Sequence, residues 1–371
     1  MDDDMKGTSG PQRTVRLDVS DSALSPVQVA ERVAAAAALL CAGQLVAFPT
    51  ETVYGLGADA TDAAAVAGIF TAKERPLSDP LIVHIADVEA LSQVARDVPP
   101  VAWDLARRFW PGPLTLVLPR AARIPTVVTA GGETVGVRLP AHPIARALIR
   151  AAGVPVAAPS ANRFMRTSPT TAAHVLADLD GRIAAVLDGG PCAVGVESSV
   201  LDLTSAPPRL LRPGGVTLEQ LREIIPETQG PVERTAAADK GVARAPGQME
   251  RHYAPHTRLI VYDAVGDAGR TAVLAGVRRA LADGLRVGAL VPDDEVAALE
   301  ALGALVERLG PPIAPDEQTR RLYAALRALD GRGCDLLLAH TFASEGLGLA
   351  LRDRLRRAAG GTLTTPPEAD R

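Results

Sequence analysis

Seven groups of polar and charged residues lie where expected strands end or loops begin, which is where α/β folds bind ligands. They combine basic side chains with hydroxyls and an amide, but include no pair of acids. Such a set describes a pocket for an anionic ligand, such as a nucleotide triphosphate or a carboxylate. Taken singly, the same residues could be a solvated pair, a core histidine or a helix cap. The groups are Thr50/Thr52, Lys73/Arg75, His84, Arg138, Ser160/Asn162, Ser198/Ser199 and Arg212.

Motifs of several other catalytic classes are absent from the sequence. It contains no Gly-x-x-x-x-Gly-Lys-Ser/Thr phosphate loop. Ser198 and Ser199 lack the Gly-x-Ser-x-Gly context of acyl-enzyme hydrolases. His252 and His256 are four residues apart, but Pro255 lies between them and disfavours the helix on which the two could bind one metal ion. We therefore expect no structural zinc and no fixed metal site in the protein.

One stretch organises these groups. Residues 45–48 read as a buried strand that Pro49 ends, and polar residues 50–54 then lead to Gly55-Leu56-Gly57. The two glycines would let the backbone approach a ligand closely, and the plain alternative is an ordinary strand exit with a glycine turn. We set a dinucleotide fingerprint aside, because several residues intervene after Pro49 and the acid near the right distance, Glu74, lies in a charged loop.

Composition narrows the class of protein. A chain of 371 residues should hold about two domains. With 47% hydrophobic and 22% charged residues it can bury ordinary cores, but an aromatic share of 3% means that Ala, Val and Leu must fill them. The net charge of −4 predicts no general affinity for nucleic acid or an anionic membrane. Any anion site must therefore be a local cluster.

Three features favour a cytoplasmic protein without membrane contact. Cys41, Cys192 and Cys334 are widely spaced, as expected in a reducing compartment. The first residues are acidic and lack the apolar core of a secretory signal. No run approaches the roughly 18 apolar residues that span a bilayer.

Strands and helices alternate along residues 14–225, which predicts an α/β domain with mixed strand directions, because several connections are short. Residues 1–13 are expected to form a disordered tail. The expected strands are 15–19, 45–48, 81–85, 114–118, 134–139, 154–157 and 183–187. The expected helices are 26–42, 62–72, 88–109 with a proline break, 142–152, 168–179 and 218–225.

Residues 226–257 lack hydrophobic periodicity and are expected to form a linker or lid. A second alternation over residues 258–359 predicts a small Rossmann-like parallel-sheet domain, followed by a loose tail at 360–371. Its expected strands are 259–262, 285–291, 304–308 and 335–338, and its expected helices are 268–282, 295–302, 316–329 and 347–359.

Several motifs of the first domain resemble those of the YrdC-type threonylcarbamoyl-AMP synthases. They follow one another in order across roughly residues 25–225, and residues 245–255 with the second α/β domain resemble the two-domain branch of that family. The motifs are Phe48-Pro-Thr-Glu-Thr-Val-Tyr-Gly-Leu-Gly, Lys73-x-Arg75-Pro, Pro80-Leu-Ile-Val-His84, Trp110-Pro-Gly-Pro-Leu-Thr, Val137-Arg-Leu-Pro, Pro159-Ser-Ala-Asn162 and Glu197-Ser-Ser-Val.

The resemblance implies a nucleotidyltransferase that converts L-threonine, bicarbonate and ATP into threonylcarbamoyl-AMP and pyrophosphate. It implies a YrdC-like twisted mixed sheet with flanking helices, joined by a long linker to the Rossmann-like domain. A partner transferase would pass the threonylcarbamoyl group to adenosine 37 of tRNA. A weak tRNA contact by this chain, for example through its arginine-rich last helix, is left open. Mg2+ is expected as a cofactor that ATP carries.

The resemblance also implies roles for individual residues. The family's catalytic tetrad corresponds to Lys73, Arg75, Ser160 and Asn162. Threonine binding is expected from Thr52, His84, Arg138 and Ser199, with the Arg138 fork on the carboxylate. Nucleotide binding is expected from Lys73, Arg75, Asp79, Thr134, Ser160, Asn162, Ser168, Arg212, Arg251 and Tyr253, the last two as part of a lid.

The chain departs from the family pattern in two places. Asp79 stands where the family often has an asparagine, which would place a negative charge near phosphate unless it meets magnesium. Residues 163–167 replace a small, glycine-containing sequence, so the loop near the ribose should differ in shape.

Two other functions remain open. An RNA-binding or ribosome-maturation module of the same fold would bind RNA without ATP turnover, but the composition shows no basic stripe studded with aromatics. A carbamoyltransferase-like module would normally sit beside acylphosphatase and zinc-finger segments, and neither is visible in the sequence.

Overall fold

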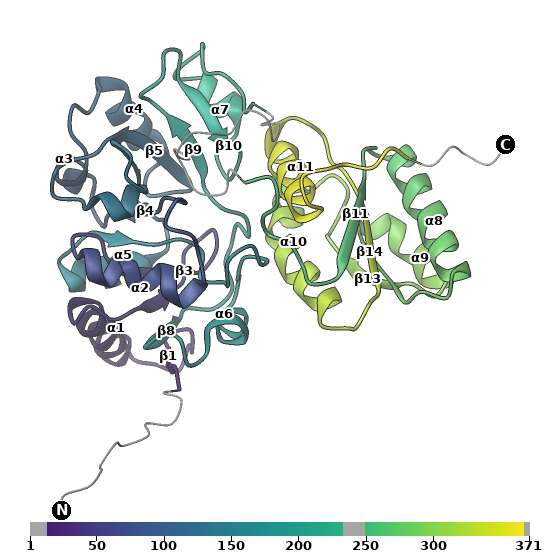
Figure 1. The fold of residues 1–371 in the computed structure, drawn as a ribbon, viewed down its shortest axis with the longest axis horizontal. Helices are drawn as coiled ribbons and strands as arrows, with labels where there is room; N and C mark the ends of the chain where they lie inside the picture. The colour runs from purple at the N-terminus through teal and green to yellow at the C-terminus, as the bar shows by residue number, and fades with distance from the viewer. Residues whose placement is uncertain (1–12, 233–248, 367–371) are drawn as a thin grey trace, which may run out of the picture.

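The structure, a computed structural model, describes residues 13–232 and 249–366, which form two α/β units with one sheet each (Figure 1). The first sheet is large and mixed and the second is parallel, so the expected fold class is confirmed. Most of the expected N-terminal tail, the centre of the expected linker at 233–248 and the end of the expected C-terminal tail lie outside the described residues.

The first sheet has ten strands in the order β1-β8-β2-β3-β7-β4-β6-β5-β9-β10. The sheet contains both parallel pairs, such as β4 with β6, and antiparallel pairs, such as β5 with β6, as the short connections predict. The strands are β1 (Val15–Asp18), β2 (Val46–Phe48), β3 (Gly55–Asp59), β4 (Ile82–His84), β5 (Leu114–Pro119), β6 (Thr134–Arg138), β7 (Val156–Ala157), β8 (Ala185–Asp188), β9 (Ser199–Asp202) and β10 (Arg209–Arg212).

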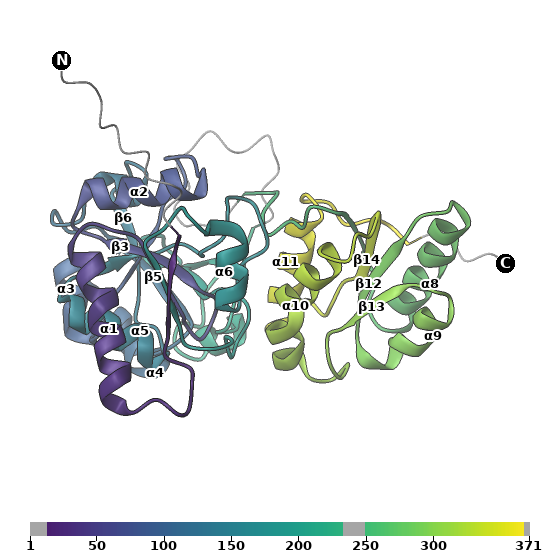
Figure 2. The same ribbon diagram turned by 90° about the horizontal axis from the view of Figure 1, so that it is seen from below.

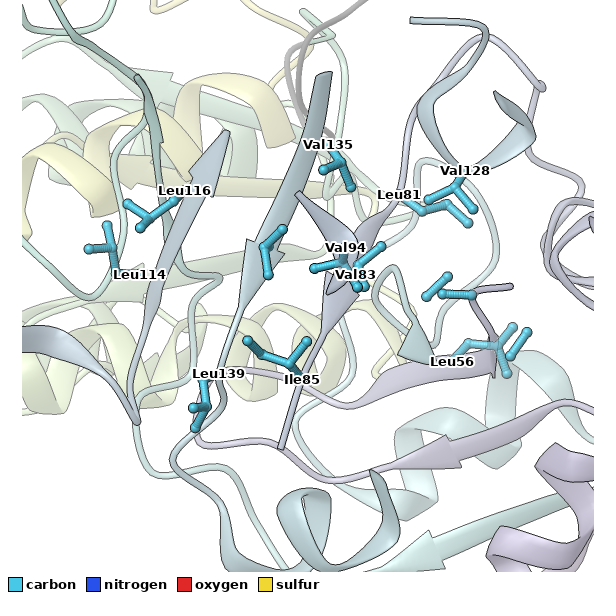
Figure 3. Close-up of a cluster of buried hydrophobic side chains, with 14 of the residues drawn as sticks. Leu56, Leu81, Val83, Ile85, Val94, Leu114, Leu116, Val128, Val135 and Leu139 are labelled. Atoms are coloured by element: carbon cyan, nitrogen blue, oxygen red, sulfur yellow. The ribbon is translucent and has the colours of Figure 1, made fainter. Parts of the chain in front are cut away.

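Helices cover both faces of this sheet. In β2, Val46 and Phe48 pack in the cluster that α1 and α5 complete, whereas Ala47 packs in the larger cluster with α2, because alternate side chains of a strand point to opposite faces. Figure 3 shows part of the larger cluster, where Leu116 and Val135 lie on neighbouring strands. The helices are α1 (Pro26–Cys41), α2 (Ala63–Lys73), α3 (Leu91–Val94), α4 (Pro100–Phe109), α5 (Pro143–Ala152), α6 (Ala172–Leu179) and α7 (Leu218–Arg222).

The glycine turn of the plain alternative does not form, because Gly55-Leu56-Gly57 begin strand β3. A Cβ on Gly57 would lie 2.9 Å from both the Phe48 ring and Val156 Cγ1. The glycine therefore makes room for the Phe48 ring beside the strand. Glycine by itself has a low propensity for strands, and pairing with the neighbouring strands β2 and β7 keeps these residues extended.

The second sheet is parallel throughout, in the order β11-β14-β12-β13. Helices α8 and α9 cover one face, and α10 and α11 cover the other, which is turned toward the first unit (Figures 1 and 2). The elements are β11 (Arg258–Tyr262), α8 (Asp267–Ala282), β12 (Val287–Val291), α9 (Val296–Ala301), β13 (Leu305–Arg308), α10 (Pro315–Asp330), β14 (Leu336–His340) and α11 (Gly346–Ala358).

The two units are docked closely through α10. Gly195 of the first unit has a φ of +83°, and a Cβ there would lie 2.4 Å from the Cα of Arg320. Arg327 of α10 forms an ion pair of 2.7 Å with Asp178 of the first unit. The first unit is therefore held against the helical face of the second.

Parts of the expected linker and tail are ordered by contacts. Tyr253 is 1% exposed, and it packs in one cluster with Val53 of the first unit and Tyr323 of α10. Beyond α11, the amide of Thr364 donates to the Val261 carbonyl at 2.8 Å, so the chain after residue 360 runs beside β11 rather than away from it.

Candidate active site

A pocket collects residues from several strands and loops of the first unit, together with His252 and Tyr253 of the segment that joins the two units. Ile82 and His84 lie two apart on β4 and both line it, so the pocket opens over one face of the sheet. Its free interior is only about 50 Å3. The lining residues are Thr50, Thr52, Val53, Gly55, Arg75, Ile82, His84, Arg138, Ala158, Pro159, Ser160, Glu197, Ser198, Arg212, His252 and Tyr253.

Half of the residues expected to bind a substrate or to act in catalysis line the pocket, and Thr50 and Ser198 of the expected polar groups line it as well. Thr52, Arg75, His84, Arg138, Ser160, Arg212 and Tyr253 line the pocket. The other expected residues are not part of its lining: Lys73, Asp79, Thr134, Asn162, Ser168, Ser199 and Arg251. Glu197 and His252 line the pocket but were not predicted as site residues. The sequence offered little signal for them, because Glu197 stood only as a member of a motif and His252 only as a rejected metal ligand.

Lys73 lies behind the pocket and shapes its wall. It is the last residue of α2, and its Nζ donates to the backbone carbonyls of Ser160 and Asn162. Asn162 in turn donates its side-chain amide to the Arg166 carbonyl at 2.8 Å. Burial, and secondly the charge of Arg75, hold the pKa of Lys73 well below its usual value. Three members of the expected tetrad, Lys73, Ser160 and Asn162, are thus connected, and the lysine positions the loop that carries Ser160.

Arg75 lines the pocket, and its positive charge is paired with a carboxylate of the chain. Its guanidinium lies 2.9 Å from the carboxylate of Asp79, and it also donates to the Pro80 carbonyl at 2.7 Å. Burial raises the pKa of Asp79, although Arg75 and Lys73 oppose the rise. Asp79 is absent from the pocket lining, so its charge meets Arg75 rather than a ligand.

Arg138 and His84 form a second wall. Arg138 lies 2.7 Å from the carboxylate of Glu51, but the Nη2 atom that makes this approach has no aligned hydrogen bond within the described residues. Burial, with a further contribution from Arg138, lowers the pKa of His84 to about 3, so its ring is neutral at pH 7. The hydroxyl oxygens of Thr50 and Thr52 lie 2.8 Å apart along the same wall.

The remaining cation, Arg212, is positioned by Ser198. Its guanidinium donates to the Ser198 carbonyl at 3.1 Å and to the Ser198 hydroxyl at 3.2 Å. Ser199, the next residue, turns its hydroxyl to the Val216 carbonyl. Ser168 donates to Glu197 at 2.6 Å. Both serines therefore support the pocket from outside its lining.

Two expected ligands lie apart from the pocket. Thr134 begins β6, four residues before Arg138, which corresponds to about 13 Å along a strand. Arg251 is exposed.

The described residues do not fit a fixed metal site. No group of three or more His, Cys, Asp or Glu side chains within 13–232 and 249–366 could hold an ion. Each of the three acids at or beside the pocket already faces an arginine: Glu51 faces Arg138, Asp79 faces Arg75, and Glu197 faces Arg354. Charge at the pocket is therefore matched by guanidinium groups.

Comparisons with known proteins identify both units. Residues 38–214 match the Sua5/YciO/YrdC family described as "Telomere recombination", and residues 216–360 match "Threonylcarbamoyl-AMP synthase, C-terminal domain". The threonylcarbamoyl-AMP synthase of Pyrococcus abyssi is 46% identical over 331 residues, covering 88% of this chain and 93% of the relative. The synthase of Bacillus subtilis is 44% identical, covering 89% and 93%.

A solved structure agrees over the whole fold. The crystal structure of P. abyssi Sua5 complexed with L-threonine has a TM-score of 0.87 and 42% identity to this chain, and the match covers 95% of this chain and 99% of that one. No helix in the described part of the chain is long and apolar enough to cross a membrane.

Proposed function

The chain belongs to the threonylcarbamoyl-AMP synthase family, and we propose that it converts L-threonine, bicarbonate and ATP into threonylcarbamoyl-AMP and pyrophosphate. One observation in the structure supports this most directly. Arg75, Arg138 and Arg212 converge on one pocket, which also contains a neutral histidine and several hydroxyls. Such a pocket suits two anionic substrates placed side by side, and the RNA-binding alternative is not favoured.

The wall formed by Arg138 and His84 suits threonine. Arg138 Nη2 and His84 Nδ1 are buried and have no hydrogen-bond partner among the described residues. A substrate carboxylate would satisfy the guanidinium, and the neutral ring would pair with the amine or hydroxyl. Thr52, which lines the same wall, supplies a further hydroxyl.

The other two arginines of the pocket suit the triphosphate. Arg75 and Arg212 would neutralise phosphate charge, Ser160 would orient it, and Lys73 would hold the loop that carries Ser160. Tyr253, whose hydroxyl has no partner among the described residues, could hydrogen-bond the nucleotide after it has entered. Mg2+ bound to the triphosphate would neutralise charge on the leaving pyrophosphate.

The reaction needs no covalent enzyme intermediate. The threonine amine and bicarbonate form a carbamate with loss of water, and a carbamate oxygen attacks the α-phosphorus in line. The bond from the α-phosphorus to the bridging oxygen breaks, and pyrophosphate leaves. The protein contributes position and charge neutralisation, as in other phosphoryl transfers.

Pyrophosphate release tests this function. Release should require ATP, threonine and bicarbonate together, and omission of threonine or bicarbonate should abolish it. Lys73→Ala should impair use of the nucleotide, and Arg138→Ala should impair use of threonine. Equal ATP consumption without threonine would overturn the proposal.

A later transfer to tRNA would need a partner transferase, and we propose that both steps occur in the cytoplasm. The arginine-rich helix α11 gives little support for a direct tRNA contact. Arg352 pairs with Asp263 at 2.7 Å, and Arg354 is fully buried. These charges are used within the chain rather than offered to an external polyanion.

A further inference from the structure

Two threonines lie side by side in the wall of the pocket. Thr50 and Thr52 come shortly after strand β2, both line the pocket, and both are buried. Their hydroxyl oxygens lie 2.8 Å apart, which is the distance of a hydrogen bond between two groups that can each donate or accept. The direction of this bond decides what the Thr52 hydroxyl presents to a substrate.

The other contacts of Thr50 fix that direction. Its Oγ1 lies 2.6 Å from the Val53 carbonyl oxygen, and a carbonyl only accepts, so the single hydroxyl hydrogen of Thr50 points there. No other donor reaches that carbonyl within the part of the chain that the structure describes. The backbone amides of Thr52 and Val53 donate to Thr50 Oγ1, each at 3.2 Å, in a turn typical of threonine. The bond between the two hydroxyls therefore runs from Thr52 to Thr50.

This direction leaves the two hydroxyls with different capacities. The hydrogen of Thr50 is used by the Val53 carbonyl, and its oxygen already accepts from Thr52 and from two amides, so Thr50 has nothing left for a ligand. Thr52 has given its hydrogen to Thr50, so only its lone pairs can face the pocket. The Thr52 hydroxyl is therefore an acceptor, and a carboxylate or phosphate oxygen, which also only accepts, is excluded as its partner.

The amine of threonine is the substrate group that suits such an acceptor, because an amine with N–H bonds is a donor. Glu51, the residue before Thr52, has its carboxylate 2.7 Å from Arg138, which is proposed to bind the substrate carboxylate. The amine and the carboxylate of an amino acid share one carbon atom, so an acceptor for the amine must lie near Arg138. Glu51 does not line the pocket, and Thr52 is the acceptor that this loop presents there.

We propose that Thr50 is a positioning residue that holds the Thr52 hydroxyl as an acceptor for the amine of L-threonine. Thr50 acts through Thr52 and contacts no substrate itself. The pair thereby selects a ligand with an amine beside its carboxylate over the same acid without the amine. This inference rests on the proposed function for the identity of the substrate, whereas the direction of the bond is a property of the protein alone.

The test begins with Thr50→Val in the full chain, which keeps the shape of the side chain and removes its hydroxyl. The Thr52 hydrogen then loses its acceptor and can turn into the pocket, where it meets the N–H bonds of the amine. Thr50→Ser keeps the hydroxyl and serves as the conservative variant. Thr228→Val is a matched control, because Thr228 is 1% exposed and donates to the Ile225 carbonyl at 2.7 Å, but does not line the pocket.

Two ligands separate recognition of the amine from the general integrity of the site. L-threonine is compared with (R)-3-hydroxybutyrate, which keeps the carboxylate and the hydroxyl but lacks the amine. Isothermal titration calorimetry, with the second ligand measured by displacement of the first, gives both Kd values without ATP or bicarbonate. Thr50→Val should raise the Kd for L-threonine about fivefold and change that for (R)-3-hydroxybutyrate by less than about twofold. Thr50→Ser and Thr228→Val should leave both Kd values within about twofold of the wild type.

A double-variant cycle tests whether Thr50 acts through Thr52. Thr52→Val removes the acceptor itself, so it should weaken L-threonine binding by about as much as Thr50→Val does. The double variant should then bind L-threonine no more weakly than Thr52→Val alone, because nothing remains for Thr50 to position. Losses that add in the double variant would overturn the positioning role.

An equal loss of affinity for both ligands in Thr50→Val would overturn the inference, since the loop rather than the amine contact would then have changed. If Thr50→Val does not fold, Thr50→Cys replaces it and is compared with Thr50→Ser, because the two side chains are similar in size and the thiol is a weak acceptor. If the wild-type protein bound neither ligand, the threonine site of the proposed function would fail. Normal threonine binding with an unselective loss would overturn the inference alone.

Discussion

The carboxylate of Glu51 lies 2.7 Å from the guanidinium of Arg138, with 10% and 5% of the two side chains exposed. The ion pair is short but is not aligned as a hydrogen bond, so Arg138 keeps donor capacity facing the pocket. Because its Nη2 atom makes no aligned hydrogen bond, the buried arginine can bind a substrate carboxylate without losing a well-formed hydrogen bond of its own.

Substitution of Arg138 by lysine should therefore weaken threonine binding selectively. Lysine retains a charge but loses the planar fork, so we expect the KM for threonine to rise about tenfold, which corresponds to about 1.4 kcal/mol. The KM for ATP should change less than about twofold. Steady-state pyrophosphate release at varied threonine measures this, and an unchanged threonine KM would exclude Arg138 from the threonine site.

Substitution of Asp79 by asparagine should improve nucleotide use. Asp79 faces the guanidinium of Arg75 at 2.9 Å, so its charge competes with phosphate for that arginine. Arg75 keeps its bonds to the Asp79 and Pro80 carbonyls after the change. We expect the KM for ATP to fall by about threefold, since a competing anion is removed. Steady-state kinetics at varied ATP provide the measurement, and a marked rise in this KM would instead assign Asp79 a direct role.

The buried His84 should make stability depend on pH. Its pKa is lowered from 6.5 to about 3 on folding, so the unfolded chain binds the proton more readily. The stability that the neutral His84 contributes is fully present above pH 6.5, and it is lost as the pH falls from 6.5 toward 3. Integration over this window gives a loss of about 2 kcal/mol between pH 7 and pH 5.

Denaturant unfolding of the wild type and of His84→Gln at both pH values isolates this effect. Other buried histidines, such as His252, contribute to both proteins equally. The glutamine variant should lose about 2 kcal/mol less than the wild type over the same range. Parallel pH profiles for the two proteins would show that His84 is not held neutral by the fold.

Docking of the two units should depend on Gly195. Alanine there would have to adopt a φ of +83° and place its Cβ 2.4 Å from the Cα of Arg320. We expect the free energy of unfolding to fall by about 2 to 5 kcal/mol, because the left-handed backbone and the steric overlap both cost energy.

Gly131→Ala is the matched control for this change. Gly131 has a φ of +82°, but nothing lies within 4 Å of the added Cβ, so only the backbone cost of about 1 to 2 kcal/mol applies. Chemical denaturation of both variants gives the comparison. Equal losses of unfolding free energy in the two variants would mean that the contact between α10 and Gly195 adds no steric cost.

The sequence by itself determined most of the elements. Alternating apolar patterns, proline and glycine breaks and caps such as Ser25 are local signals, so most strands and helices of both units lie close to where they were expected. Strands β3, β9 and β10 were not expected. The motifs also identified the family and the polar groups that meet at the pocket, since seven of the expected residues do line it.

Only the tertiary structure decided which way individual side chains turn. Lys73 is a basic residue at the end of a helix, where a solvated side chain is the ordinary expectation, yet it is buried and its partners are backbone carbonyls about 90 residues away. Gly57 reads as a turn residue until the Phe48 ring is placed beside it. Arg354 is one of several arginines on its helix, and its burial depends on Glu197, 157 residues earlier. A local pattern does not encode a partner that only the folded chain brings within reach.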